Sequence, residues 1–334
     1  MELPWLGGAP LFSSGSEALA ALVRWGADRR GWRRVWLPSY YCPEVPAALR
    51  TLAGGVEVRT FPDHDLLAPP SPDLPGAQPG DVVVVANQLG IRPRPRPDWP
   101  ALDCVVLVED HSHDLASDWA LTSRADYAFA SLRKTLPLPD GGAVWSPRGL
   151  ELPPEPPRSD DDERLADRLA SALAGRALGD LAEADEPPRF RALARSAAAN
   201  PGSRPGISPV SRALLPTMPV RAWHERRRRN LALLADTVGT PRNGRILVAP
   251  DGGVAFALTL VFDTEAARRE AEEALIARAV VPTILWPLDP ARDPGVDAVD
   301  ANLSRRILSI HGDQRFDEAD VRRLAAILRE ALHR

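Results

Sequence analysis

The chain has 334 residues, of which 44% are hydrophobic, so it is long enough for a large core and exceeds the size at which one core usually keeps growing. Its formal net charge is -4 and its arginines are interspersed with 45 acidic residues, which argues against a nucleic-acid partner. The two cysteines, Cys42 and Cys104, lack metal-ligand spacing, which argues against a disulfide framework or a structural metal. No apolar run approaches the roughly 18 residues of a membrane span. We therefore predict a soluble cytoplasmic protein.

The first 145 residues alternate short β-branched runs with helical stretches, a pattern that produces a mostly parallel sheet with helices on its faces. The expected strands are residues 35–37, 56–61, 82–87, 105–109, 127–130 and 143–145, and a helix is expected to include residues 18–23. Residues 82–85 and 104–108 are continuously apolar, which is typical of strands covered on both sides. We therefore predict an α/β fold with a three-layer, mostly parallel central sheet.

A smaller α+β unit is expected to follow. Residues 146–206 are rich in Pro, Asp, Glu, Ala and Arg, with helical spacing at 162–174, and indicate surface helices and connections. Beyond them we expect a helix at 222–236, strands at 245–248 and 254–262, a helix at 264–278, a strand near 283–286 and a last helix. Asp317 is the expected N-cap of that helix, whose buried stripe repeats every 3.6 residues through Val321, Leu324, Ala325, Leu328 and Leu332. The predicted domains are 1–215 and 216–334.

Lys134 is the only lysine in the chain, since the other 40 basic residues are arginine. An arginine cannot lose its proton, whereas a lysine amine can become neutral and attack a carbonyl. Lys134 lies in SLRKTLPLPDGG, between the strands expected at 127–130 and 143–145, where the Asp140-Gly141 pair favours a tight turn. The motif is consistent with a rigidly held nucleophile or with an exposed lysine in an ordinary hairpin.

Further chemistry-bearing residues stand at helix starts and at the ends of expected strands, where an open α/β sheet binds its ligand. In SSGSEA, Ser14 and Glu17 form a capping box, so the N–H groups of Gly15 and Ser16 would point outward as a phosphate site. An ordinary capped helix is the alternative. In LPSYYCP, a tyrosine could stack on a flat heteroaromatic ring or simply belong to the core.

The run VEDHSH closes an apolar strand with carboxylates and two histidines. A partly buried Asp110 could hold a pyridinium nitrogen protonated, which makes the ring a better electron sink. It could also cap the loop, or join His111 and His113 around a metal, although no further metal ligand is evident.

In order and approximate separation, SSGSEA, LPSYYCP, VEDHSH and SLRKTLPLPDGG resemble fold-type I pyridoxal-phosphate enzymes, specifically the DegT/DnrJ/EryC1/StrS sugar aminotransferases. The segments GISPVSRALL with ERRRRN, VPTILWP and RRILSIHGDQRFDEADV are similar to later parts of that family, so the resemblance covers most of the chain.

The resemblance implies pyridoxal 5'-phosphate as the cofactor and assigns roles to individual residues. Lys134 would form the internal aldimine and move the α-proton, Asp110 would pair with the pyridine nitrogen, and His113 would bond to the phenolate oxygen. Ser131 stands three residues before the lysine, where the common pattern has five. The remaining implied positions are the phosphate-binding Gly15, Ser16 and Ser131, a stacking residue among Tyr40, Tyr41 and Cys42, and Asn87, whose role is open.

The activity that the resemblance implies is amino transfer from an amino-acid donor such as glutamate to a keto sugar or other ketone in a biosynthetic pathway, within a homodimer. An arginine fork would bind the donor carboxylate. The candidates are Arg305, Arg306 and Arg315, with Arg212 and Arg242 also open, whereas Arg226 to Arg229 are expected to form a solvated helix face. Two alternatives remain: a pyridoxal-phosphate enzyme that catalyses dehydration, elimination or condensation, and a non-catalytic binding or regulatory protein with this fold.

Overall fold

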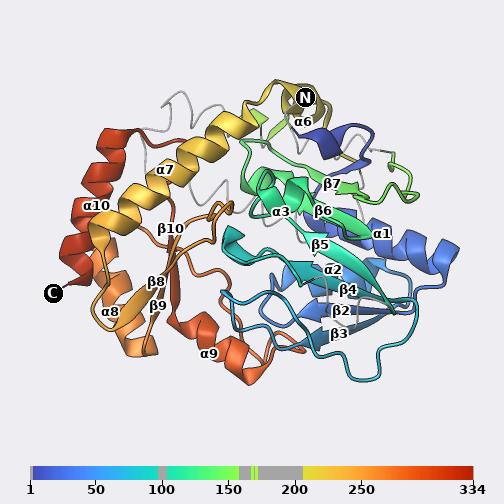
Figure 1. Cartoon of the computed structure of the whole chain (residues 1–334), viewed down its shortest axis with the longest axis horizontal. Coiled ribbons are helices and arrows are strands. Elements are labelled where there is room, and N and C mark those ends of the chain that lie inside the picture. The colour runs from blue at the N-terminus through green and yellow to red at the C-terminus, as the bar shows by residue number, and fades with distance from the viewer. Residues whose placement is uncertain (1–2, 97–103, 158–166, 169, 172–205, 334) are drawn as a thin grey trace.

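A seven-stranded sheet forms the N-terminal part of the molecule and a three-stranded sheet forms the C-terminal part (Figure 1). The computed structural model describes residues 3–96, 104–157, 167–168, 170–171 and 206–333. The large sheet has the order β1-β7-β6-β5-β4-β2-β3. Its strands are β1 (Leu11–Phe12), β2 (Arg34–Pro38), β3 (Glu57–Phe61), β4 (Asp81–Ala86), β5 (Val105–Asp110), β6 (Tyr127–Ser131) and β7 (Gly142–Trp145).

The expected α/β fold with a mostly parallel sheet is confirmed. The five strands β2 to β6 pair in parallel, and β7 pairs antiparallel with both β6 and β1. Every residue of β4, with the sequence DVVVVA, is buried, as its unbroken apolar run predicts.

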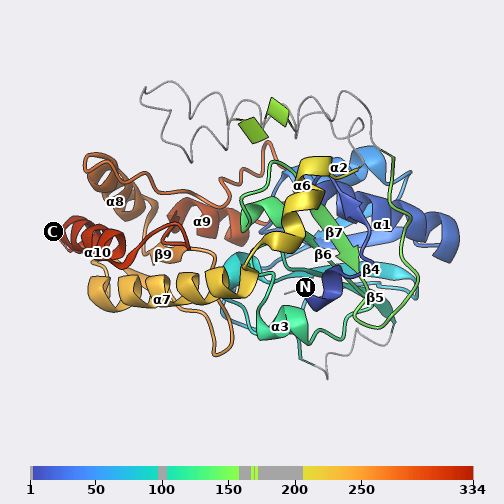
Figure 2. The same cartoon turned by 90° about the horizontal axis from the view of Figure 1, so that it is seen from above.

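Helices and loops cover both faces of this sheet (Figure 2). The apolar residues of α1 (Gly15–Arg30) and α2 (Glu44–Leu52) pack on one face. The other face is covered by the 3-10 turn η1 (Pro4–Leu6), the short helix α3 (Asp118–Leu121) and the first turn of α7 (Val220–Val238). Three layers result.

The C-terminal sheet is antiparallel, with the order β10-β9-β8. Alternate residues of its central strand, Leu258, Leu260 and Phe262, pack against α7 and the last helix, which begins after Asp317 as predicted. Of the predicted stripe on that helix, Leu324 is only partly buried. The elements are α6 (Pro209–Leu214), β8 (Gly244–Leu247), β9 (Leu258–Phe262), α8 (Glu265–Ile276), α9 (Ala298–Arg306), β10 (Ile307–Ile310) and α10 (Glu318–Leu332).

Two expected strands differ from the structure. The strand near 283–286 is wrong, because only Thr283 bridges to a neighbouring strand and the flanking Pro282 and Pro287 carry no N–H for a ladder. The strand expected at 254–262 begins only at Leu258, because the Phe256 N–H bonds instead to Leu89 O in the N-terminal part. The helix expected at 162–174 lies mostly outside the described residues.

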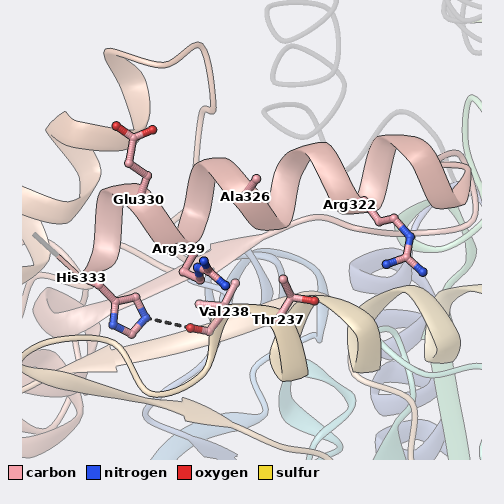
Figure 3. Close-up of a pocket in the computed structure, with 7 residues that line it drawn as sticks. All are labelled: Thr237, Val238, Arg322, Ala326, Arg329, Glu330 and His333. Carbon is pink, nitrogen blue, oxygen red and sulfur yellow. Dashed lines mark hydrogen bonds between the residues drawn. The ribbon is translucent and has the colours of Figure 1, made fainter.

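A surface hollow of about 600 Å³ lies between the C-terminal end of α7 and the length of α10 from Arg322 to its C-cap, His333 (Figure 3). It lies in the C-terminal part, far from the large sheet, and the His333 ring donates a hydrogen bond to Val238 O across it. None of the residues predicted to be functional lines this hollow. Among the described helices, none combines the length and the apolar character that crossing a membrane requires.

Candidate active site

Most of the predicted site residues gather at the carboxyl edge of the parallel strands. The residues Ala86, Asp110 and Phe129 are register partners across β4, β5 and β6, so the segments that follow them start side by side. Strand β1 runs parallel to β6 through β7, and therefore delivers the start of α1 to the same edge. This is the edge at which an open α/β sheet binds ligands.

Lys134 ends the 3-10 turn η4 (Leu132–Lys134), which directly follows β6. Its half-buried amine lies 3.4 Å from His113 Nε2 and 5.4 Å from the centre of the Trp286 ring. Among the described residues, no carboxylate lies within ion-pair distance of this amine. The amine is therefore not committed to a structural salt bridge.

His113 is buried and fixed in orientation beside the amine. Its Nδ1 accepts a hydrogen bond from the Leu89 N–H (3.1 Å), which assigns the proton of a neutral ring to Nε2, the atom that faces Lys134. The ring centre lies 4.7 Å from that of Phe256 and 5.5 Å from that of Trp286. Both aromatic residues come from the C-terminal part of the chain.

Burial lowers the pKa of His113 well below its usual value, and the positive charges of Lys134 and Arg227, with that of His311 when it is protonated, lower it further. Burial also lowers the pKa of His311. Both rings are therefore neutral near pH 7. The positive charges of Lys134 and Arg227 remain, and they favour a negatively charged ligand in this neighbourhood.

Asp110 is the last residue of β5 and is buried with both oxygens oriented. Its Oδ1 accepts the Ser112 N–H (2.8 Å) and its Oδ2 accepts a hydrogen bond from the Tyr41 hydroxyl. Burial, followed by the negative charge of Asp110, raises the pKa of Tyr41 well above its usual value, so the hydroxyl stays protonated and donates. Asp110 thus presents a buried carboxylate whose two oxygens are each held by a hydrogen-bond donor.

The start of α1 lies directly against the lysine loop. Ser14 is the N-cap, and its hydroxyl accepts the Glu17 N–H (3.2 Å), which is the Ser14 half of the predicted capping box. A Cβ on Gly15 would lie 2.9 Å from Ser131 Cβ, and one on Gly142 would lie 2.1 Å from Ser14 O. These close approaches leave the first N–H groups of α1 beside Ser131, and such groups bind anions.

The other predicted residues lie as follows. Tyr40 is fully buried, donates its hydroxyl to Leu285 O and meets Trp286 edge to face. The Asn87 amide donates to Asp114 (3.0 Å), and its carbonyl accepts the Arg92 N–H (3.1 Å).

The arginines proposed for a donor carboxylate have partners within the protein. Arg315 binds Asp313 (2.7 Å), Arg305 lies 3.6 Å from Glu265, and Arg212 pairs with Glu155. Arg306 bonds to Asn302 (2.6 Å). His111 lies against Glu109 (3.0 Å) and does not join His113, and the described residues contain no cluster able to hold a metal.

Arg227 corrects a prediction. Arg228 and Arg229 are exposed, as a solvated helix face requires, but Arg227 is only 3% exposed and lies beside the site. The sequence contained a signal for this, because Arg227 follows Val220 by seven residues and precedes Leu234 by seven, which places it in the buried stripe of α7. The other site residues that were missed, Phe256, Trp286, His311 and Gln314, come from loops without a local pattern.

Neither protein-family models nor curated proteins match the sequence, but solved structures match along the whole chain. A DegT DnrJ EryC1 StrS aminotransferase from Brucella abortus is 14% identical, with a TM-score of 0.59 over 98% of this chain and 86% of that one. The sugar aminotransferase CalS13 from Micromonospora echinospora is 15% identical, with a TM-score of 0.64 over 96% and 87%. A Streptococcus pneumoniae protein in a PLP form is 11% identical, with a TM-score of 0.61 over 97% and 86%. At these identities the likeness establishes the fold, in agreement with the family resemblance of the motifs.

Proposed function

We propose that this chain is a pyridoxal-phosphate-dependent aminotransferase that moves an amino group from an amino-acid donor to a keto sugar or another ketone. The observation that carries the proposal is the position of the only lysine. Its amine, which forms no ion pair with the described carboxylates, stands at the carboxyl edge of the sheet beside His113, with the Asp110 carboxylate on the neighbouring strand and the start of α1 against the same loop. The shared fold with sugar aminotransferases supports the same activity.

The residues at this edge fit the polar ends of the cofactor. Lys134 would take the aldehyde and Asp110 the ring nitrogen, while the N–H groups of Gly15 and Ser16 would take the phosphate. Gly15 and Gly142 support this fit, since a Cβ on either would collide with the facing segment and push the helix start away from Ser131. The bound cofactor supplies an electron sink for breaking a bond at the substrate carbon.

The protein's own groups would then have separate tasks. The Lys134 amine carries a proton to and from the substrate carbon, for which a flexible primary amine is suited. Neutral His113 keeps an Nε2–H donor at the same place. Trp286 and Phe256 limit the access of water to the amine and to His113.

The test begins with the purified protein and added pyridoxal phosphate. We expect visible absorbance and, after borohydride reduction, a cofactor mass adduct on the peptide that contains Lys134. Lys134→Arg is the matched control, because it keeps the positive charge but cannot form the adduct. Wild-type protein without an adduct, or with an adduct on another residue, would contradict the proposal.

The reaction type is tested next by adding L-glutamate to the loaded protein. Amino transfer predicts one equivalent of 2-oxoglutarate and conversion of the cofactor to its amine form. Elimination or dehydration of added amino acids without this conversion would favour the other pyridoxal-phosphate chemistries.

A homodimer with a domain boundary near residue 215 completes the proposal. Light scattering measures the mass of the assembly, and an activity assay follows its dilution. If the dimer is the active form, dilution to a monomer should abolish activity. A fully active monomer would contradict it.

A further inference from the structure

Arg227 is a buried cation whose hydrogen-bonding capacity is mostly unused. Its Nη2 donates to Gln314 Oε1 (2.8 Å), but its Nε and Nη1 have no acceptor among the described residues. Only 3% of the surface of Arg227 is exposed to solvent. A buried donor without an acceptor costs free energy, and a buried charge without a partner costs more.

The nearest carboxylates are already engaged elsewhere. Both oxygens of Asp313 accept hydrogen bonds from Arg315 (2.9 and 2.7 Å). Asp114 accepts from Asn87 through Oδ2, and its Oδ1 lies 2.8 Å from His224 Nε2. Neither forms an ion pair with Arg227, so the guanidinium lacks the bidentate partner that its shape suits.

The guanidinium is joined to the lysine loop by two routes. Gln314, which accepts from Arg227, donates its own amide to Thr135 O (3.0 Å), one residue beyond Lys134. On the other side, the Arg227 guanidinium carbon lies 5.8 Å from the centre of the Phe256 ring, which packs on His113. His113 in turn is 3.4 Å from the Lys134 amine.

We infer that Arg227 binds the carboxylate of the amino donor, through the Nε and Nη1 groups that lack an acceptor in the described part of the chain. The donor is accordingly an amino acid and not a simple amine. This inference rests on the proposed function, and it places the donor site at Arg227 in preference to Arg305 or Arg315, which face carboxylates of the protein.

The experiment compares wild type, Arg227→Gln and Arg228→Gln as cofactor-loaded proteins in single-turnover mixing with L-glutamate. Arg228 is the matched control, because it lies next in the same helix, is exposed and pairs with Glu225 (2.7 Å). We expect Arg227→Gln to raise the half-saturating glutamate concentration about 10- to 100-fold, as expected for loss of a hydrogen-bonded charge. n-Propylamine, which has no carboxylate, should react with all three proteins alike.

A second variant covers the possibility that Arg227→Gln does not fold. Arg227→Lys keeps the positive charge but lacks the Nε and Nη1 donors, so half-saturation should again rise while the n-propylamine reaction is unchanged. Unchanged half-saturation in either folded variant would overturn the inference.

The two proposals fail in different ways. If wild-type protein forms no Lys134 adduct, the proposed function fails and the inference fails with it. If wild type and Arg227→Gln form the adduct equally and also bind glutamate equally, only the inference fails. Loss of cofactor retention with unchanged glutamate binding would assign the guanidinium to the phosphate and overturn the inference.

Discussion

Gly142 is the residue on which the geometry of the proposed phosphate site most depends. It begins β7 and lies in register with Phe12 of β1 and Ser131 of β6, directly beneath the first turn of α1. A Cβ at this position would lie 2.1 Å from Ser14 O and 2.8 Å from Gly15 N, both backbone atoms. The substitution Gly142→Ala therefore cannot be accommodated by a side-chain rotation.

The size of the effect follows from that distance. An ordinary van der Waals contact is at least 3.4 Å, so Ser14 must retreat from 2.1 Å by about 1.3 Å, and the start of α1 must move with it. Overpacking of this kind costs about 1–3 kcal/mol in the free energy of unfolding. The N–H groups of Gly15 and Ser16 move too, and we expect the affinity for pyridoxal phosphate to fall about tenfold or more through weakened hydrogen bonds to the phosphate.

Urea unfolding and cofactor titration measure the two effects separately. Gly7→Ala is the matched control, since its Cβ would meet only Pro4 O at 3.6 Å and the φ of Gly7 is −66°. This control should change stability by less than about 0.5 kcal/mol. If Gly142→Ala unfolds and binds cofactor like Gly7→Ala, the close packing of β7 on the helix start is refuted.

Three further predictions concern buried ionisable groups. Because the pKa of His113 is lowered, the folded state binds fewer protons than the unfolded state below pH 6.5, so stability is present above that pH and is lost as the pH falls. The free energy of unfolding, measured with urea, should fall between pH 7.5 and 5.5, and His113→Gln should remove up to about 1.4 kcal/mol of that fall. An equal fall in the variant would contradict this. The Arg92 guanidinium bonds to both oxygens of buried Asp63, at 2.7 and 2.8 Å. Arg92→Ala should therefore lower the free energy of unfolding by about 3–5 kcal/mol at pH 7.5, and the double variant with Asp63→Asn should lower it less. Equal losses in urea unfolding would argue against the pair. Asp110→Asn should leave the Lys134 adduct in place but slow single-turnover reaction with glutamate about 10²- to 10³-fold, and an unchanged rate would exclude Asp110 as the partner of the cofactor ring.

The large sheet could be predicted from the sequence because its signals are local. Runs such as the four valines of β4 are apolar on both sides of the strand, and only a strand covered on two faces buries them all. The caps at Ser14 and Asp317 likewise depend on residues three positions apart. Once the strands are parallel, the residues at their ends meet at one edge, so the proximity of Asp110, His113 and Lys134 follows from topology.

The cover of the site could not be predicted in this way. Trp286 and Phe256 reach His113 from segments more than 140 residues away, and nothing in VPTILWP shows which loop it will face. The same holds for the bond from Tyr40 to Leu285 O, which spans 245 residues. Such contacts depend on how the two sheets are joined, through the apolar cluster that Tyr40 shares with β9 and β10.

Arg227 shows that one part of this long-range arrangement does leave a local trace. Val220, at the start of α7, packs in the core beneath β6 and β7, whereas Leu231, Leu234 and Val238 pack in the core of the C-terminal sheet. Arg227 occupies the same stripe between these two groups, so it lies where α7 passes from one core to the other. Ligand sites occur preferentially at such junctions, because polar groups from both parts converge there. For Arg227, its position within an apolar stripe at the junction of two predicted domains therefore indicates a binding residue, whereas its membership in a run of four arginines indicated only a solvated helix face.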